Sequence, residues 1–110
     1  MIPLEQLEEM FAGMRAQTRW DVDGPMLWGY FFTDGNEEKL KLLAERLSAD
    51  GYRYVGIHTA EDDGEYVLHV ERVETHSPET LHSRNAKLAG LADELGVATY
   101  DGMDVGPVAS

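Results

Sequence analysis

Apolar residues at three- and four-residue spacing open the chain. The spacing predicts an amphipathic helix from Pro3 to about Thr18, and it is set by Leu4, Leu7, Phe11 and Met14. The next segment, 19–25, has no such period and ends in Gly-Pro, as expected of a connector. We therefore expect residues 1–25 to form a helix and linker before a main unit of residues 26–110, all within one structural domain.

The main unit begins with a strand and a helix. Residues 26–33 are apolar at both odd and even positions, which is typical of a central strand covered on both faces. Asn36 then suits an N-cap, and the stripe of Leu40, Leu43 and Leu47 predicts a helix over 37–49.

A hairpin, a helix and a last strand are expected to follow. Residues 53–59 and 65–73 have the composition of strands, and Asp63-Gly64 is a strong hairpin signal. Ser77 as N-cap and Pro78 in the first turn begin a helix that ends at Gly96. Residues 97–100 then form a short strand that ends in a turn at Asp101-Gly102.

The order of these elements predicts the fold class. After the first helix it is strand, helix, strand, strand, helix, strand, which is the split pattern of a ferredoxin-like βαββαβ sandwich. We expect an α+β domain whose antiparallel sheet has its first and third strands in the middle and helices on one face. The extra N-terminal helix is then free to pack elsewhere.

Three aromatic side chains, Trp28, Tyr30 and Phe32, share one face of the first strand. Such a face on an open sheet stacks nucleic-acid bases in some proteins. The charge of this chain opposes that function, so we expect the N-terminal helix, or a second copy of the chain in a dimer, to cover the aromatic face.

Net charge limits the partners. Twenty-one acidic residues against nine basic ones give a formal charge of −12, which repels phosphate backbones and attracts basic protein segments. We therefore expect no direct binding of nucleic acid. The longest apolar run is too short to span a membrane, and the lack of cysteine and of a signal-peptide pattern favours a cytoplasmic location.

Candidate chemistry is sparse. If Asp63-Gly64 forms a two-residue turn, His58 faces His69 across the hairpin with Glu71 nearby. Two imidazoles and a carboxylate could bind zinc. We treat this zinc site as the weaker alternative, because no third ligand stands at the spacing of a known zinc motif. His76, Ser77, Glu79 and His82 lack a nucleophile elbow, and Ser77 already has a role as a cap. We predict no enzyme activity and no cofactor.

The chain resembles the family of bacterial regulators of ribonuclease activity B. The resemblance spans Met26 to Val108 and lies in the strand Met26–Asp34 and in a C-terminal run, Leu88, Leu91-Ala92, Val97 and Tyr100-Asp101-Gly102. It implies a protein inhibitor that binds the noncatalytic scaffold region of the ribonuclease E assembly and changes RNA turnover. The expected partner is thus a protein with a basic surface, ribonuclease E by resemblance.

The exposed acidic segments are our candidates for partner binding: Glu61, Asp62 and Asp63 in the hairpin turn, and Tyr100, Asp101, Met103 and Asp104 at the C-terminal corner. A simpler role for Asp101 is a turn carboxylate that bonds to its own backbone. The alternative function is that of another acidic binding protein, such as a toxin-neutralising immunity protein or a nucleic-acid mimic. A small metal- or ligand-binding protein is a further, less favoured alternative.

Overall fold

The computed structural model describes residues 2–59 and 64–108. Its elements follow the predicted order, and all but the last strand lie within two residues of the predicted bounds. They are α1 (Leu4–Gln17), β1 (Met26–Asp34), α2 (Glu37–Ala49), β2 (Arg53–Thr59), β3 (Tyr66–Glu74), α3 (Pro78–Glu94) and β4 (Thr99–Gly106).

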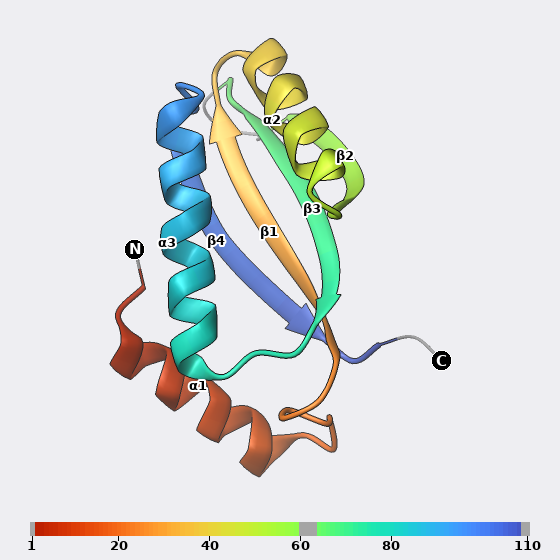
Figure 1. Ribbon diagram of the computed structural model, residues 1–110, viewed down its shortest axis with the longest axis vertical. Helices are drawn as coiled ribbons and strands as arrows, with labels where there is room; N and C mark the ends of the chain where they lie inside the picture. The colour runs from red at the N-terminus through yellow and green to blue at the C-terminus, as the bar shows by residue number, and fades with distance from the viewer. Residues whose placement is uncertain (1, 60–63, 109–110) are drawn as a thin grey trace.

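The strands form one antiparallel sheet in the order β2-β3-β1-β4. The first and third strands occupy the middle, so the predicted ferredoxin-like α+β fold is confirmed. Figure 1 shows α2 and α3 over the same face of this sheet, with β1 visible between them, while α1 crosses the end of the molecule beneath the start of α3.

The aromatic row of β1 faces the helices. Trp28, Tyr30 and Phe32 are fully buried, and the ring of Phe11 from α1 stacks on Trp28 with centroids 5.9 Å apart. The expectation that α1 covers this face is thus right at Trp28, but α2 and α3 cover the rest. A single chain buries the row, so a dimer is not needed to cover it.

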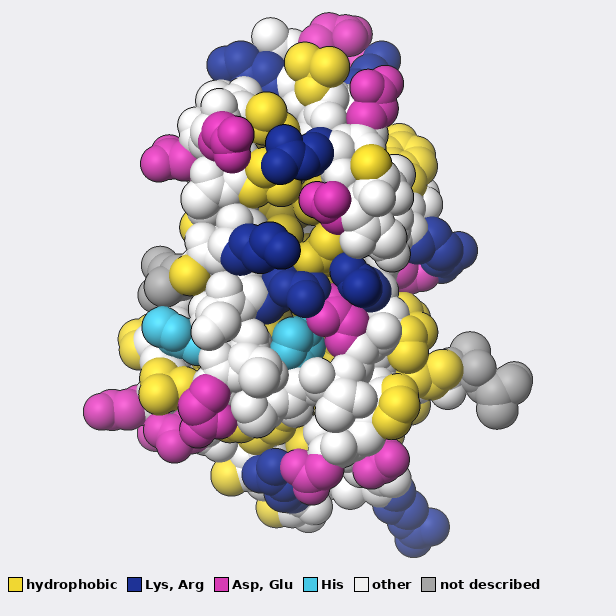
Figure 2. Space-filling view, viewed as in Figure 1, with side chains coloured by type: hydrophobic (Ala, Val, Ile, Leu, Met, Phe, Trp, Pro, Cys, Tyr) yellow, Lys and Arg dark blue, Asp and Glu magenta, His cyan; other side chains and the backbone are white. Residues whose placement is uncertain are grey.

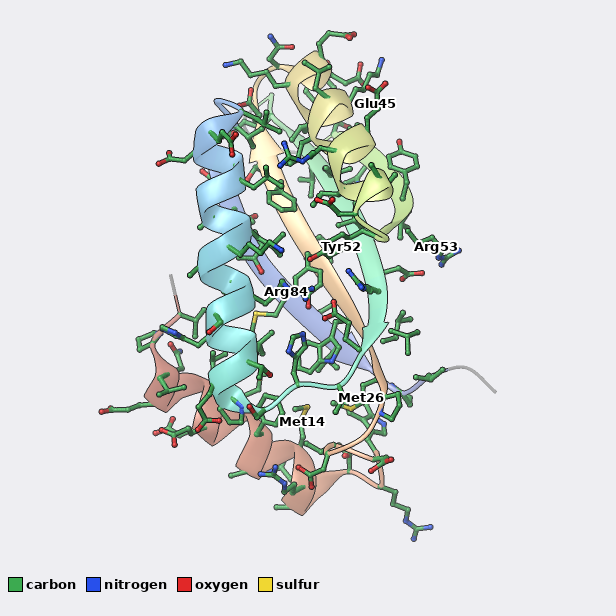
Figure 3. All side chains as sticks on the ribbon, viewed as in Figure 1. Met14, Met26, Glu45, Tyr52, Arg53 and Arg84 are labelled. Atoms are coloured by element: carbon green, nitrogen blue, oxygen red, sulfur yellow. The ribbon has the colours of Figure 1, made fainter. Side chains whose placement is uncertain are left out.

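The same end of the core is completed by two methionines. Met14 of α1 and Met26 of β1 are both buried in the central hydrophobic cluster, and Figure 3 shows them close to the crossing of α1. The N-terminal helix therefore shares one core with the sheet.

Helix α3 has the predicted start and stop. The Ser77 hydroxyl accepts a hydrogen bond from the backbone N–H of Thr80 at 3.2 Å, and the Thr80 hydroxyl accepts one from the N–H of Ser77 at 2.8 Å. After the helix, Gly96 has a φ of 73°, a left-handed conformation that favours glycine. These caps fix the ends of the helix that supports the candidate site.

The predicted hairpin register is wrong. Gly56, not His58, lies opposite His69, and His58 lies opposite Val67. The reason is the longer connection: the last pair is Thr59 with Tyr66, and the register shifts again between Tyr54 and Gly56. Because a two-residue turn was assumed, the predicted pairing was displaced by two positions.

Replacement of Phe11 by alanine tests the role of α1 in the core. We expect Phe11→Ala to lower the free energy of unfolding by about 3 kcal/mol or more, because it removes a fully buried ring that stacks on Trp28. Urea titration measures the change. The control is Glu8→Ala on the exposed side of the same helix, and a loss below about 1 kcal/mol for Phe11→Ala would contradict a shared core.

Candidate functional site

The Tyr100-Asp101-Gly102 segment is a β-bulge inside β4. Phe32 of β1 pairs with Tyr100, and the next residue, Phe31, pairs with Gly102, so Asp101 is the extra residue. Gly102 has a φ of 112°, which is easily adopted only by glycine. The predicted turn at this position is wrong, as is a strand of 97–100: β4 begins at Thr99, and pairing with β1 carries it on to Gly106.

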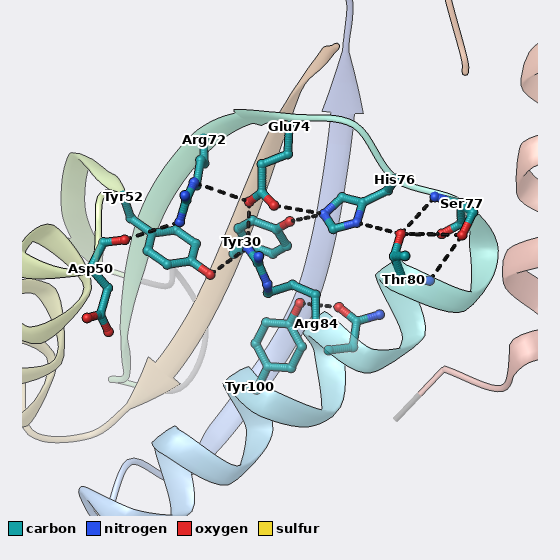
Figure 4. A network of polar contacts seen from close by, with 11 residues as sticks. Tyr30, Asp50, Tyr52, Arg72, Glu74, His76, Ser77, Thr80, Arg84 and Tyr100 are labelled. Atoms are coloured by element: carbon teal, nitrogen blue, oxygen red, sulfur yellow. Dashed lines mark hydrogen bonds and ion pairs between the residues drawn. The ribbon is translucent and has the colours of Figure 1, made fainter. Parts of the chain in front are cut away.

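Two of the predicted site residues point inward from β4. The Tyr100 hydroxyl donates a hydrogen bond to Oδ1 of Asn85 at 2.6 Å, as Figure 4 shows. Burial raises the pKa of Tyr100, so this donor keeps its proton at neutral pH. Met103 also lies on the helix side, with its sulfur 3.7 Å from Nδ2 of Asn85. Tyr100 and Met103 are therefore partly buried, with their side chains held against Asn85 of α3.

The two aspartates of β4 lie in different places. Asp101 is exposed at the bulge. Asp104 pairs with Gly29 on the opposite face of the sheet, where a side chain at Gly29 would collide with the carboxylate of Asp104 and the ring of His69. Gly29 thus leaves room for the close approach of these two side chains. The structure separates Asp101 from Asp104, which the sequence had grouped together.

A recess of about 320 Å³ opens beside the bulge. Three parts of the chain line it: the N-terminus with the start of α1, the middle of α3, and the bulge itself. The lining residues are Ile2, Pro3, Gln6, Asn85, Tyr100, Asp101 and Gly102. We take this recess as the candidate site because Tyr100-Asp101-Gly102, the segment that carries the family resemblance, lines it together with the start of the N-terminal helix.

Asn85 is the residue of this site that the sequence could have revealed. It is 1% exposed and lies on the buried stripe of α3 with Leu81, Leu88 and Ala92. A buried polar residue on an apolar helical stripe needs hydrogen-bond partners. The contributions of Ile2, Pro3 and Gln6 had no such signal, because they come from an element far away in the chain.

The other predicted partner-binding residues, Glu61, Asp62 and Asp63, lie outside the described residues.

The hairpin histidines do not gather into a metal site. Within 2–59 and 64–108, no three His, Asp or Glu side chains are placed to share a metal ion. Glu71 instead pairs with Arg53, and the ring of His69 stacks on Phe31 with centroids 4.4 Å apart. Burial lowers the pKa of His69, although the charge of Asp104 acts in the opposite direction. The ring of His69 therefore lies stacked on Phe31 on the open face of the sheet, in surroundings that favour its neutral form.

A polar network that the sequence did not predict lies between the sheet and α3 (Figure 4). Glu74 is at its centre: Oε1 is 2.5 Å from a guanidinium nitrogen of Arg84, and Oε2 is 3.2 Å from Nε2 of His76. The same His76 nitrogen is 3.3 Å from the hydroxyl of Tyr30. Arg84 also donates to the Tyr52 hydroxyl at 2.7 Å. The network ties β1, β3 and α3 together.

Basic side chains gather above this network. Figure 2 shows Lys and Arg side chains over the middle of the helix-covered face, between α3 and α2. Arg72 and Arg84 both lie over the ring of Tyr52, at 5.3 and 5.6 Å from its centroid, and Figure 3 labels Tyr52 and Arg84 in this groove. Lys87 lines the hollow beside them. The chain is therefore acidic overall but has a local basic groove.

The network keeps Glu74 ionised. Burial alone would raise the pKa of Glu74, but the hydrogen bond from His76 and the charge of Arg84 outweigh it and hold the pKa below its usual value. The alternation of side chains along β3 could have indicated this network, because Arg72 and Glu74 lie on the same strand face as the buried residues Leu68 and Val70.

Replacement of Glu74 by glutamine tests the network. At neutral pH, Glu74→Gln should lower the free energy of unfolding by about 2 kcal/mol, because Arg84 loses its charged partner. A carboxyl whose pKa is lower in the folded state stabilises the protein above its unfolded pKa, and this stabilisation is lost as pH falls through the folded pKa. The difference between the two proteins should therefore shrink below about pH 4.

Urea titrations at neutral and acidic pH measure this difference. The matched control is Glu45→Gln on the exposed surface of α2, which should change stability by less than about 0.5 kcal/mol. An effect of Glu74→Gln that is equal at both pH values would contradict a role for the ionised carboxylate.

Comparison with known proteins adds the family. The family model described as Regulator of ribonuclease activity B matches residues 4–105, from the first residue of α1 to the last but one of β4, and this range includes most of the recess lining. No curated protein sequence matches the chain. No helix among the described residues is long and apolar enough to cross a membrane. Since the match covers nearly the whole chain, the protein belongs to the Regulator of ribonuclease activity B family, whose role is regulatory.

Proposed function

We propose that this protein regulates RNA turnover by binding a basic segment of a ribonuclease assembly, ribonuclease E by resemblance, in the cytoplasm. The observation that carries the proposal is the family match over residues 4–105. The formal charge of −12 supports a basic partner, because long-range attraction speeds the encounter of oppositely charged surfaces.

The distribution of exposed acids supports docking at the recess. Glu5, Glu8 and Glu9 are exposed on α1 and lie within three residues of the recess residue Gln6. Asp101 of the bulge is also exposed and lines the recess. A basic segment that passes over the recess would therefore meet carboxylates from both α1 and β4.

The side chains of the polar network support binding over catalysis. His76 is buried and is held by Glu74, Tyr30 and Thr80. Ser77, the hydroxyl nearest to it in sequence, is occupied in the cap of α3. The Thr80 hydroxyl beside His76 is likewise part of the capping box of α3, so the contacts of His76 hold the fold together.

Binding to the scaffold region of ribonuclease E tests this function. We expect the purified chain to bind that region, to slow cleavage of a reporter transcript by the assembly, and to bind several-fold more weakly when salt rises from roughly 0.05 to 0.3 M, because salt screens exposed charges. Calorimetry at both salt concentrations measures the binding and its salt dependence, and a cleavage assay measures the slowing of cleavage. Capture of a toxin or a DNA-processing enzyme instead, with no binding to ribonuclease E, would favour the alternative class of acidic binder.

A further inference from the structure

We propose that the recess beside the β4 bulge receives one arginine side chain of the partner's basic segment. This inference rests on the proposed function, since it gives the docking surface a specific anchor. It concerns the space bounded by α1, α3 and the bulge.

The walls of the recess suit the stem of such a side chain. Ile2, Pro3 and the ring of Tyr100 supply apolar surface. Arginine buries its methylene stem against apolar groups while its head stays polar. The volume of about 320 Å³ accommodates a single long side chain and leaves the rest of the partner segment on the surface.

The mouth of the recess suits the guanidinium head. Two exposed residues that line the recess supply polar groups: Asp101 of β4 has a carboxylate and Gln6 of α1 an amide. Among the described residues, no Lys or Arg side chain forms an ion pair with Asp101, whereas Asp23, Asp50, Glu71 and Glu74 each have an arginine partner. A planar head with five donors matches a carboxylate in two-point contact better than an ammonium does.

The wall that the arginine would contact is held in place before binding. The hydrogen bond from Tyr100 to the buried Asn85 fixes the ring of Tyr100 against α3. Gly102 allows the bulge that gives Asp101 its exposed position. A preformed site loses less conformational entropy when a ligand enters it.

The charges around the recess favour a cationic side chain over an anionic one. The basic side chains of the helix-covered face gather in the groove between α2 and α3, where Arg84 is paired with Glu74. The recess instead is lined by Asp101, and Glu5, Glu8 and Glu9 are exposed on the helix that contributes Gln6. An anionic group would be repelled there, and a cation attracted.

Two aspartate variants of β4 test the inference. Asp101→Asn and Asp104→Asn remove the same charge from the same strand, but only Asp101 lines the recess, while Asp104 lies on the opposite sheet face. We expect Asp101→Asn to weaken binding of the scaffold region by about tenfold and Asp104→Asn by less than about twofold. Equal losses would show that only the overall field acts, and would overturn the proposal.

A charge-neutral variant separates shape from charge. Gln6→Trp places a large side chain at the mouth from an exposed position of α1, so it should weaken binding as strongly as Asp101→Asn while the thermal midpoint stays near that of the wild type. Binding at wild-type strength would overturn the recess as the anchor.

A short peptide probe makes the test independent of ribonuclease E. On addition of hexa-arginine, the amide NMR signals of Gln6 and Gly102 should shift more than that of Gly29 on the open face, and hexa-lysine should give smaller shifts at the same concentration. If the scaffold region does not bind but these shifts occur, the proposed function fails and the recess stands. If the scaffold region binds but neither the peptide nor Asp101→Asn has an effect at the recess, only the recess inference fails.

Discussion

Burial of Trp28, Tyr30 and Phe32 against the helices is the constraint on which the rest of this structure depends. Side chains alternate along a strand, so this row fixes which residues of every paired strand face the helices. On β3 the register places Leu68 and Val70 there, and then Arg72 and Glu74. Two charged side chains are thereby drawn to the covered face of the sheet, and the structure must satisfy them.

The polar network is the answer to that requirement. A half-buried carboxylate is stable only with charged and hydrogen-bonding partners, and Glu74 obtains them from Arg84 and His76. One polar atom of the aromatic row has no such partner. Among the described residues, Nε1 of Trp28 is buried without a hydrogen-bond partner. The stacking of Phe11 and the edge contact of His76 with the indole hold Trp28 by packing.

Local patterns were enough to predict the elements, their order and the fold, because hydrophobic periods and caps such as Ser77 act within one turn or strand. Register was not predictable in this way. Asp-Gly suits a tight turn and a bulge equally, and only pairing with β1 decides that Asp101 is an inserted residue within a longer strand. The sequence named Tyr100 and Asp101 for the candidate site but missed Asn85 and Gln6, which reach it through the packing of α3 and α1.

The same packing explains how an acidic protein with a basic groove presents mainly negative charge to a partner. The side chain of Arg84 is only 19% exposed and is paired with Glu74, so the carboxylate of Glu74 largely compensates its positive charge. Arg72 is bound to the backbone carbonyl of Asp50 and lies over Tyr52. The carboxylates of α1 and of the bulge, by contrast, are exposed. The charge that the surface presents then depends on where charges are compensated as well as on their number.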